Sequence, residues 1–510
     1  MTLETNQEKL MAITIIKTKH KDIFIMRSIL RIIRLSALCS VLILLSACGH
    51  SSKTVRLNEW RSDGKVMRCD TLEVTAGSSW MGKKCCNFLI TGQALCEPGA
   101  FASLMFHSDG QSGYEVIFHN GPIDGTLKTG SLSAVRNLYR SLAADGEWAD
   151  FEIAVRGKNI AVKINGVDVV CYTEPSSPYR SAEFANRLLG DGKLYLKGIE
   201  GKTFFRNMML APLPEDARNE NDTLPAIDEQ NDAVIRLQQQ FFPVIDYHVH
   251  LKGDLTKEMA HAMSMNYGIN YGVAPNAGEG GVGRMLANDE EVYDYFKEVK
   301  PLPFLCGVQG EGRRWSTQFS PEALGIFDYL FTDAMTIVDH KRRIARIYRP
   351  EEVQLDGLTP QQYMDVIVDQ TVKILENEPA DIYANATYIP DDWLADYDNY
   401  WTPERMDKVL DVLVKHDIAV EISARYKIPN ETFIRKAKAR GLKFTFGTNN
   451  VDSRFGRLEY CTEMVKKCGL TVEDMWFPIM SHRSQREVVD YNGFLTPNAP
   501  LPIALFSKAN

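Results

Sequence analysis

Two histidines stand two residues apart in the stretch VIDYHVHLKG, at positions 244–253. Asp246, His248 and His250 alternate there with apolar residues, as in a β-strand whose successive side chains point to opposite faces. Both imidazoles therefore share one face, from which they can reach a single metal ion at about 2.0–2.2 Å. Asp246 lies one pleat deeper on that face, and we expect it to orient an imidazole rather than to bind metal.

The elements that must position these side chains are strands alternating with helices. From Pro243 onward, seven candidate strands are separated by helical stretches, and the strands lie at 244–250, 269–274, 302–308, 328–332, 381–386, 418–423 and 443–447. Such alternation is typical of a parallel sheet. Seven repeats in about 240 residues favour a closed barrel over an open sheet.

Polar side chains stand where these strands end. The carboxyl ends of parallel strands meet at one rim of a barrel, where barrel enzymes have their active sites, so these side chains should come together. A single carboxylate at a strand end is often only a loop cap, and His-x-His alone can be a chance pair. Several such ends together favour a metal site. The candidates are Gln309, Glu311, Asp333, Asn385, Glu421, Thr448, Asn449, Asn450 and Asp452.

The motif DYHVH and the seven-fold alternation resemble the polymerase-and-histidinol-phosphatase (PHP) superfamily over residues 243–480. The resemblance implies a distorted (β/α)7 barrel that binds up to three metals for phosphoester hydrolysis. The later ligand positions depart from that pattern. Asn385 and Met335 stand where the superfamily has histidines, and Thr448 and Asn450 replace an Asp and a His. Amide oxygens bind transition metals poorly, so a three-metal site is not expected.

The reduced ligand set predicts one divalent transition metal, and zinc, manganese, cobalt and iron all stay open. We expect His248, His250 and at least one of Glu311 and Asp333 to bind it, with open positions left for substrate. Glu421 is either a further ligand or the general base. The candidate catalytic residues are thus Glu311, Glu421 and Asp452, and the candidate substrate contacts on the barrel are Asn385 and Asn449.

The region before the barrel, residues 54–213, is rich in strand patterns. Apolar and polar residues alternate there between Gly, Asn and Asp turns, which predicts two antiparallel sheets. The segments SGYEVIFHN (112–120), GEWADFEIAVRGKNIAVKINGVDVV (146–170) and FFRNMMLAPL (204–213) resemble the 3-keto-disaccharide hydrolase domain family. The resemblance implies a concanavalin-like (jelly-roll) β-sandwich and a carbohydrate ligand. A Cys-rich stretch at 69–100 departs from the family pattern.

Three residues of this region are candidate sugar contacts. In the resembled family the Gly-Tyr-Glu-Val strand faces the sugar groove, which suggests Tyr114 and Glu115. Trp148 could stack on a sugar ring. The alternatives are that Glu115 is an outward-facing carboxylate of the strand, and that Tyr114 and Trp148 belong to the core.

The N-terminal part of the chain carries an export pattern. Arginines precede a short apolar run at 35–45, which is too short for a comfortable transmembrane helix. The run ends in Leu45-Ser46-Ala47-Cys48, which resembles a bacterial lipobox and implies cleavage before Cys48 and lipidation of its thiol. A plain signal peptide is the alternative. Gly49 is not a residue that retains lipoproteins in the inner membrane, so we expect an outer-membrane lipoprotein of the cell envelope.

The predicted architecture is therefore multidomain. It comprises a misassigned start plus signal peptide at 1–47, the β-sandwich at 48–213, a linker at 214–242, the (β/α)7 barrel at 243–480 and a C-terminal tail at 481–510. The net charge of −8, with no basic block after the signal, argues against a nucleic acid partner. Contact with the membrane is expected through the lipid anchor alone. The sequence does not give an oligomeric state.

The two resemblances together suggest a chemistry. A ketone at sugar C3 acidifies the proton on C2, a base removes it, and the resulting enolate expels the C1 substituent, while a metal stabilises the enolate. We therefore predict a glycan-processing lipoprotein that cleaves 3-keto-glycosides by metal-assisted elimination or hydrolysis. One alternative is a PHP-type metal phosphoesterase with a carbohydrate-binding accessory domain. The other is a sugar-binding lipoprotein without enzymatic activity.

The lipobox generates the first testable prediction. Replacing Cys48 with Ala removes the thiol that would carry the lipid, so the protein should move from the membrane fraction to the soluble fraction. Fractionation followed by immunoblotting measures this, with a Cys39→Ala variant inside the apolar run as the control. If the Cys48→Ala protein stays in the membrane fraction, the lipid anchor is wrong.

Overall fold

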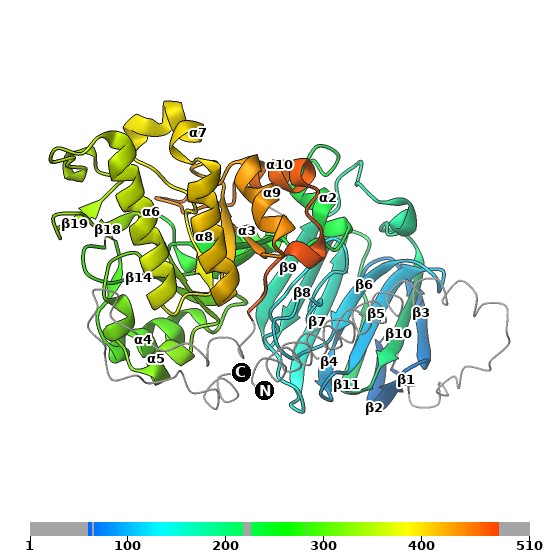
Figure 1. The fold of residues 1–510 in the computed structure, drawn as a ribbon. Coiled ribbons are helices and arrows are strands. Elements are labelled where there is room, and N and C mark those ends of the chain that lie inside the picture. Colours follow the sequence, from blue (N-terminus) through cyan, green and yellow to red (C-terminus); the bar gives the residue numbers. More distant parts are fainter. Residues whose placement is uncertain (1–59, 64–65, 218–225, 282, 479–510) are drawn as a thin grey trace, which may run out of the picture. The chain divides into compact units, whose positions relative to one another are not determined.

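The first domain consists of two antiparallel sheets (Figure 1). The computed structural model describes residues 60–63, 66–217, 226–281 and 283–478. One sheet has the order β1 (Trp60–Asp63), β2 (Val66–Thr75), β11 (Lys202–Pro212), β4 (Phe88–Cys96), β7 (Ala149–Arg156), β8 (Asn159–Ile164) and β9 (Val167–Thr173). The other has the order β3 (Ser79–Cys85), β10 (Gly192–Glu200), β5 (Phe101–Ser108) and β6 (Tyr114–Phe118). The β-sandwich predicted from the sequence is confirmed.

The sandwich core follows from period-two alternation. Along β7, Phe151, Ile153 and Val155 are buried, while Asp150 before them is exposed and Glu152 between them is only half-buried. Aromatic rings from the two sheets meet in the core, since Phe118 contacts Phe151 and Phe205 edge to face at ring-centroid distances of 5.2 and 5.1 Å. Burial of these rings holds the two sheets together.

The second domain is a closed parallel barrel of seven strands. Its strands pair in the order β13 (Asn270–Val273), β12 (Ile245–Val249), β22 (Phe444–Gly447), β21 (Ala419–Ser423), β20 (Ile382–Tyr383), β17 (Tyr329–Thr332) and β16 (Leu305–Gly310). Pairing of β16 with β13 closes the ring, with Gly272 opposite Leu305. Each strand falls within or next to one of the seven segments expected from the sequence, so the seven-stranded barrel is confirmed.

Helices and short hairpins connect these strands. The helices are α2 (Ala233–Gln239), α3 (Lys257–Tyr267), α4 (Asp289–Val299), α5 (Pro321–Gly325), α6 (Pro360–Asn377), α7 (Tyr397–Tyr400), α8 (Pro403–His416), α9 (Glu431–Ala439) and α10 (Glu459–Cys468). The additional strands are β14 (Asn276–Ala277), β15 (Met285–Leu286), β18 (Thr336–Val338) and β19 (Ile344–Arg346), and the short 3-10 turns include η3 (Ala182–Phe184). A capping box at Thr359 begins α6, and the Thr402 hydroxyl caps α8.

The barrel interior is filled with aromatic side chains. Tyr329 contacts Tyr247 edge to face at 5.2 Å, and its hydroxyl donates to the carbonyl oxygen of Tyr247 at 2.5 Å. Two glycines make room for the Tyr329 ring, because a Cβ at Gly272 would lie 2.2 Å from its hydroxyl and a Cβ at Gly307 would lie 2.3 Å from its ring. Trp476 packs against Tyr247 at 5.5 Å. The interior below the strand ends is therefore packed rather than hollow.

A loop of the sandwich sequence reaches the barrel. Tyr139 and Leu127 belong to the same apolar cluster as Tyr247 and Tyr329. Nearby, the Asn137 side chain donates to the carbonyl oxygen of Gln238 at 3.0 Å, within the segment expected to be a linker. The sandwich and the barrel accordingly belong to one compact unit.

Every predicted segment of the chain lies partly or wholly outside the described residues. Outside lie the signal segment with its lipidation site Cys48, the first residues of the sandwich domain, part of the linker, the last two residues of the predicted barrel, and the C-terminal tail at 481–510. Within the described part of the chain, no helix is long and apolar enough to cross a membrane. The lipid anchor stays a prediction.

Candidate functional site

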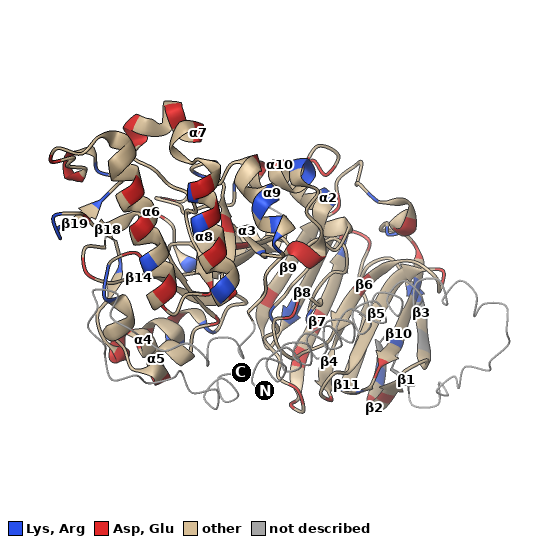
Figure 2. Cartoon of the chain, viewed as in Figure 1, with Lys and Arg blue, Asp and Glu red and all other residues tan. Residues whose placement is uncertain are grey.

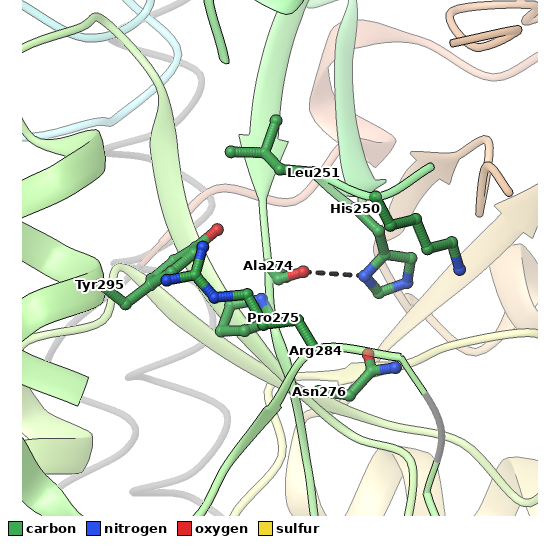
Figure 3. Close-up of a pocket in the computed structure, with 8 residues that line it drawn as sticks. His250, Leu251, Ala274, Pro275, Asn276, Arg284 and Tyr295 are labelled. Atoms are coloured by element: carbon green, nitrogen blue, oxygen red, sulfur yellow. Dashed lines mark hydrogen bonds between the residues drawn. The ribbon is translucent and has the colours of Figure 1, made fainter. Parts of the chain in front are cut away.

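A cavity of about 180 Å³ opens at the carboxyl ends of the barrel strands. Its lining comes from the ends of several strands and from the loops that follow them, as expected for a barrel active site. The lining residues are His250, Lys252, Asn276, Gln309, Glu311, Asp333, Met335, Tyr348, Asn385, Arg425, Tyr426, Asn449 and Val451. A narrower pocket shares His250, Lys252 and Asn276 and continues to Arg284 and Tyr295 (Figure 3).

His248 lies directly behind this cavity, between two hydrogen-bonding groups. Its Nδ1 is 2.7 Å from Oε1 of Glu421, and its Nε2 is 3.0 Å from the side-chain oxygen of Gln309. The other oxygen of Glu421 accepts the backbone N–H of Asn385. The amide of Gln309 donates onward to Asp333 at 2.9 Å. One chain of hydrogen bonds therefore runs from β21 through β12 and β16 to the end of β17.

This chain shows what Glu421 contacts in the described structure. The carboxylate is buried and is not part of the cavity lining. It contacts the imidazole of His248 and the backbone N–H of Asn385, an arrangement that orients the imidazole. The two roles expected from the sequence, metal ligand and general base, stay predictions. The sequence predicted that Asp246 orients an imidazole. The carboxylate of Asp246 instead accepts the backbone N–H of His248 at 3.1 Å and the hydroxyl of Thr448 at 2.6 Å.

His250 presents one ring nitrogen to the cavity. Its Nδ1 is 2.8 Å from the carbonyl oxygen of Ala274, as the dashed line in Figure 3 shows. A carbonyl can only accept, so Nδ1 carries the proton, and the side chain of Gln309 lies at the other side of the ring. Burial, reinforced by the neighbouring His248 and Lys252, holds the pKa of His250 well below its ordinary value. The imidazole is therefore neutral and a weak base.

Two carboxylates face the cavity from the ends of β16 and β17. Glu311 accepts the side-chain N–H of Asn276 at 2.6 Å and the hydroxyl of Tyr348 at 3.1 Å. Asp333 is buried, and burial together with the nearby charge of Glu311 raises its pKa to about 7. A carboxyl group with such a pKa exchanges its proton near neutral pH, which suits general acid–base catalysis.

The structure brings most of the predicted barrel residues together. His250, Glu311, Asp333, Asn385 and Asn449 line the cavity, with His248 and Glu421 behind them. The exception is Asp452, which pairs with Arg454 at 2.5 Å on the loop after β22 and is not part of the lining. The Arg454 side chain lowers the pKa of Asp452 to about 2, so this carboxylate is a weak base.

Several lining residues were missed by the sequence analysis. Lys252 continues the alternation that places His248 and His250 on one face, so the motif itself contained that signal. Arg425 and Tyr426 follow β21, where a polar strand end was already expected. No local sequence pattern indicated that Tyr348 lies at the cavity, because it belongs to the loop that follows the β18–β19 hairpin.

The predicted metal ligands fit an ion only in part. The His250 tautomer suits a ligand, because its Nδ1–H is held by a carbonyl. Nε2 of His248, however, faces the oxygen of Gln309, and no group of three His, Cys, Asp or Glu side chains among the described residues is placed to hold an ion. The ligand set is not assembled in this arrangement, and the metal stays a prediction.

The three candidate sugar contacts of the sandwich have partners within the domain. Tyr114 is fully buried, and its hydroxyl donates to Glu174 at 2.5 Å and accepts from Arg180 at 2.7 Å. Glu115 accepts from Ser103 at 2.6 Å and lies 3.3 Å from Arg187. The guanidinium of Arg206 covers one face of the Trp148 ring at 4.0 Å. Tyr114 therefore belongs to the core, which was the alternative interpretation.

Comparison with known proteins bears on the first domain. Residues 50–211 match the family model described as the 3-keto-alpha-glucoside-1,2-lyase-like domain. This part of the chain is thus similar to domains of the 3-keto-disaccharide hydrolase type. No curated protein matches the chain.

Solved structures resemble about a third of the chain at low identity. A candidate glycosyl hydrolase from Parabacteroides distasonis is 15% identical, with 31% of this chain and 84% of that chain covered and a TM-score of 0.24. The carbohydrate-binding module CBM66 from Bacillus subtilis is 14% identical, with 30% and 90% covered and a TM-score of 0.17. A lichenase from a mouse hindgut metagenome is 12% identical, with 32% and 91% covered and a TM-score of 0.21.

The raised pKa of Asp333 predicts a pH dependence of stability. Between the ordinary carboxyl value near 4 and the folded value of about 7, the folded protein holds a proton that the unfolded chain has lost. The free energy of unfolding should therefore fall as the pH rises through this window. Asp333→Asn cannot ionise and does not lose stability in this window. The free energy of unfolding of the variant minus that of the wild type should therefore be larger at pH 8 than at pH 5.

Urea unfolding at the two pH values, with EDTA present, measures this difference. The matched control is Asp369→Asn on α6, whose exposed carboxylate pairs with Lys408 at 3.0 Å. Parallel pH profiles for the wild type and Asp333→Asn would contradict the assignment.

Proposed function

We propose that the protein is a carbohydrate-processing enzyme that cleaves glycosides oxidised at C3 of the sugar, by elimination at the barrel cavity. The observation that carries the proposal is the match of residues 50–211 to the 3-keto-alpha-glucoside-1,2-lyase-like domain. The sandwich then supplies recognition of the carbohydrate, and the barrel supplies acid–base groups. An elimination at this site needs one base and one donor to the developing oxyanion.

Asp333 is the proposed base. In its ionised form it takes the proton from C2, and the electrons of the broken C–H bond form the enolate between C2 and C3. The C1–O bond then breaks, and the leaving oxygen takes a proton from the newly protonated Asp333. Its pKa of about 7 suits both directions of transfer.

The other side chains hold the reacting groups in place. Tyr426 lines the cavity and is the proposed donor to the C3 oxygen as that oxygen gains charge. Asn385 approaches Asp333, with its side-chain nitrogen 3.4 Å from the carboxylate, and Asn449 donates to Asn385 at 3.1 Å. Gln309 and His248 fix the carboxylate from the other side, so that its position is set before substrate arrives.

A substrate comparison tests the proposed function. The full chain is incubated with a 3-keto-disaccharide, with the unoxidised disaccharide and with p-nitrophenyl phosphate, and products are followed by NMR. We expect turnover of the 3-keto-disaccharide alone, with an enol or its ketone tautomer as product, and a loss of about 100-fold or more in Asp333→Asn. Asp369→Asn should keep full activity.

Each other outcome favours a different function. Turnover of p-nitrophenyl phosphate alone would favour the metal phosphoesterase. Binding of the sugar without turnover of any substrate would favour the non-enzymatic lipoprotein. Turnover that survives in Asp333→Asn would place catalysis outside the barrel cavity.

The metal is a separate prediction with its own test. Binding at the predicted ligands would require Gln309 to release Nε2 of His248. Elemental analysis of the purified protein should show one equivalent of a transition metal, which His248→Ala/His250→Ala loses and Asn385→Ala keeps. A wild-type protein that stays free of metal after incubation with zinc, manganese, cobalt and iron, yet cleaves the sugar, would contradict it.

A further inference from the structure

Two cationic side chains meet at the mouth of the barrel cavity without a carboxylate partner. Lys252 follows β12 and Arg425 follows β21, and both line the cavity. The two charges act on each other, although Glu311 influences Lys252 more strongly than Arg425 does, and Asp452 lies within electrostatic reach of Arg425. Among the described residues, no carboxylate forms an ion pair with either of them.

Several cations elsewhere on the barrel are paired with carboxylates. Figure 2 shows basic and acidic residues interspersed along α6 and α8. Arg405, Lys408 and Lys415 of α8 reach carboxylates of α6 at 2.8, 3.0 and 3.3 Å. Arg284, in the narrower pocket beside the cavity, pairs with Glu298 at 3.0 Å. Lys252 and Arg425 differ from these cations because they line the cavity without such a pair.

The arrangement holds the Arg425 guanidinium in place while leaving donors free. One of its nitrogens donates to the backbone carbonyl of Asn449 at 3.1 Å, and its plane lies 4.9 Å from the ring of Tyr426. The described residues provide no acceptor for its other N–H groups. A guanidinium fixed in this way can present two parallel donors to a planar anion.

The carboxylates below do not account for these charges. Glu311 is the strongest charged influence on Lys252, and its two oxygens also accept from Asn276 and Tyr348. Asp333 accepts from Gln309 and from the backbone of Met335. Two like charges at the rim of a narrow cavity repel each other unless an anion lies between them, so this rim is complementary to a negative group.

We propose that Lys252 and Arg425 bind a carboxylate of the substrate, so that the glycoside cleaved here carries a uronic acid or another carboxylated unit. This rests on the proposed function and names the class of its substrate. A planar monoanion matches the guanidinium plane. It also adds less charge above Glu311 and Asp333 than a phosphate dianion would, so those carboxylates repel it less.

Calorimetric binding to the full chain tests the inference without requiring turnover. The probes are glucuronate, glucose, glucose 6-sulfate and glucose 6-phosphate. We expect glucuronate to bind most tightly, with an affinity that falls as salt is added. Arg425→Gln and Lys252→Gln should each weaken glucuronate binding by about tenfold or more and leave glucose binding unchanged.

The control is Arg454→Gln, which removes an exposed cation that is paired with Asp452 outside the cavity, and it should bind glucuronate as the wild type does. Equal binding of glucuronate and glucose would overturn the inference, as would a preference for the phosphate or sulfate ester. Because binding is measured apart from cleavage, glucuronate that binds at this rim without turnover of a 3-keto-glycoside that carries a uronic acid would refute the proposed function and leave the anion site standing.

Discussion

The contact between His248 and Glu421 is the interaction on which the barrel site depends. The two side chains are buried and only 2.7 Å apart, and they join strands β12 and β21, which do not pair with each other in the sheet. The intervening strand β22 makes room for them through Gly447, where a Cβ would lie 1.6 Å from the Glu421 carboxylate and 2.8 Å from Cβ of His248. A buried pair of this kind stabilises only when its remaining groups are hydrogen-bonded. Asn385 and Gln309 meet that requirement, which fixes the ends of β20 and β16 as well.

The sequence allowed the barrel to be predicted almost strand by strand, for a physical reason. Its strands are buried on both faces, so they appear as short apolar runs separated by helical patterns, and their polar ends mark the rim. The hydrogen-bond partners of the side chains at the rim could not be predicted from the sequence. His248, Glu421 and Gln309 were each visible as polar residues near strand ends, but which atoms meet depends on barrel closure. Tyr348 could not be predicted as a cavity residue, because no local sequence pattern indicates that its loop reaches the rim.

The sandwich shows a different limit. Alternation along a strand separates two faces but does not say which one is buried, since both faces of GYEVIF contain residues that suit a core. The structure buries Tyr114 and leaves Glu115 to pair with Arg187. Likewise, no local signal shows that Tyr139 joins a cluster with barrel residues more than a hundred positions later, because contacts of that range follow from tertiary packing.

The aromatic side chains that fill the barrel have a consequence for how product fragments leave the site. Tyr247, Tyr329 and Trp476 occupy the interior, so the cavity does not continue through the barrel. In the proposed reaction, a glycoside cleaved in this cavity yields two fragments, and both must leave at the rim of the barrel. A fragment that stays bound there would compete directly with fresh substrate. Turnover in the proposed reaction should then slow as that fragment accumulates, however fast the bond itself is broken.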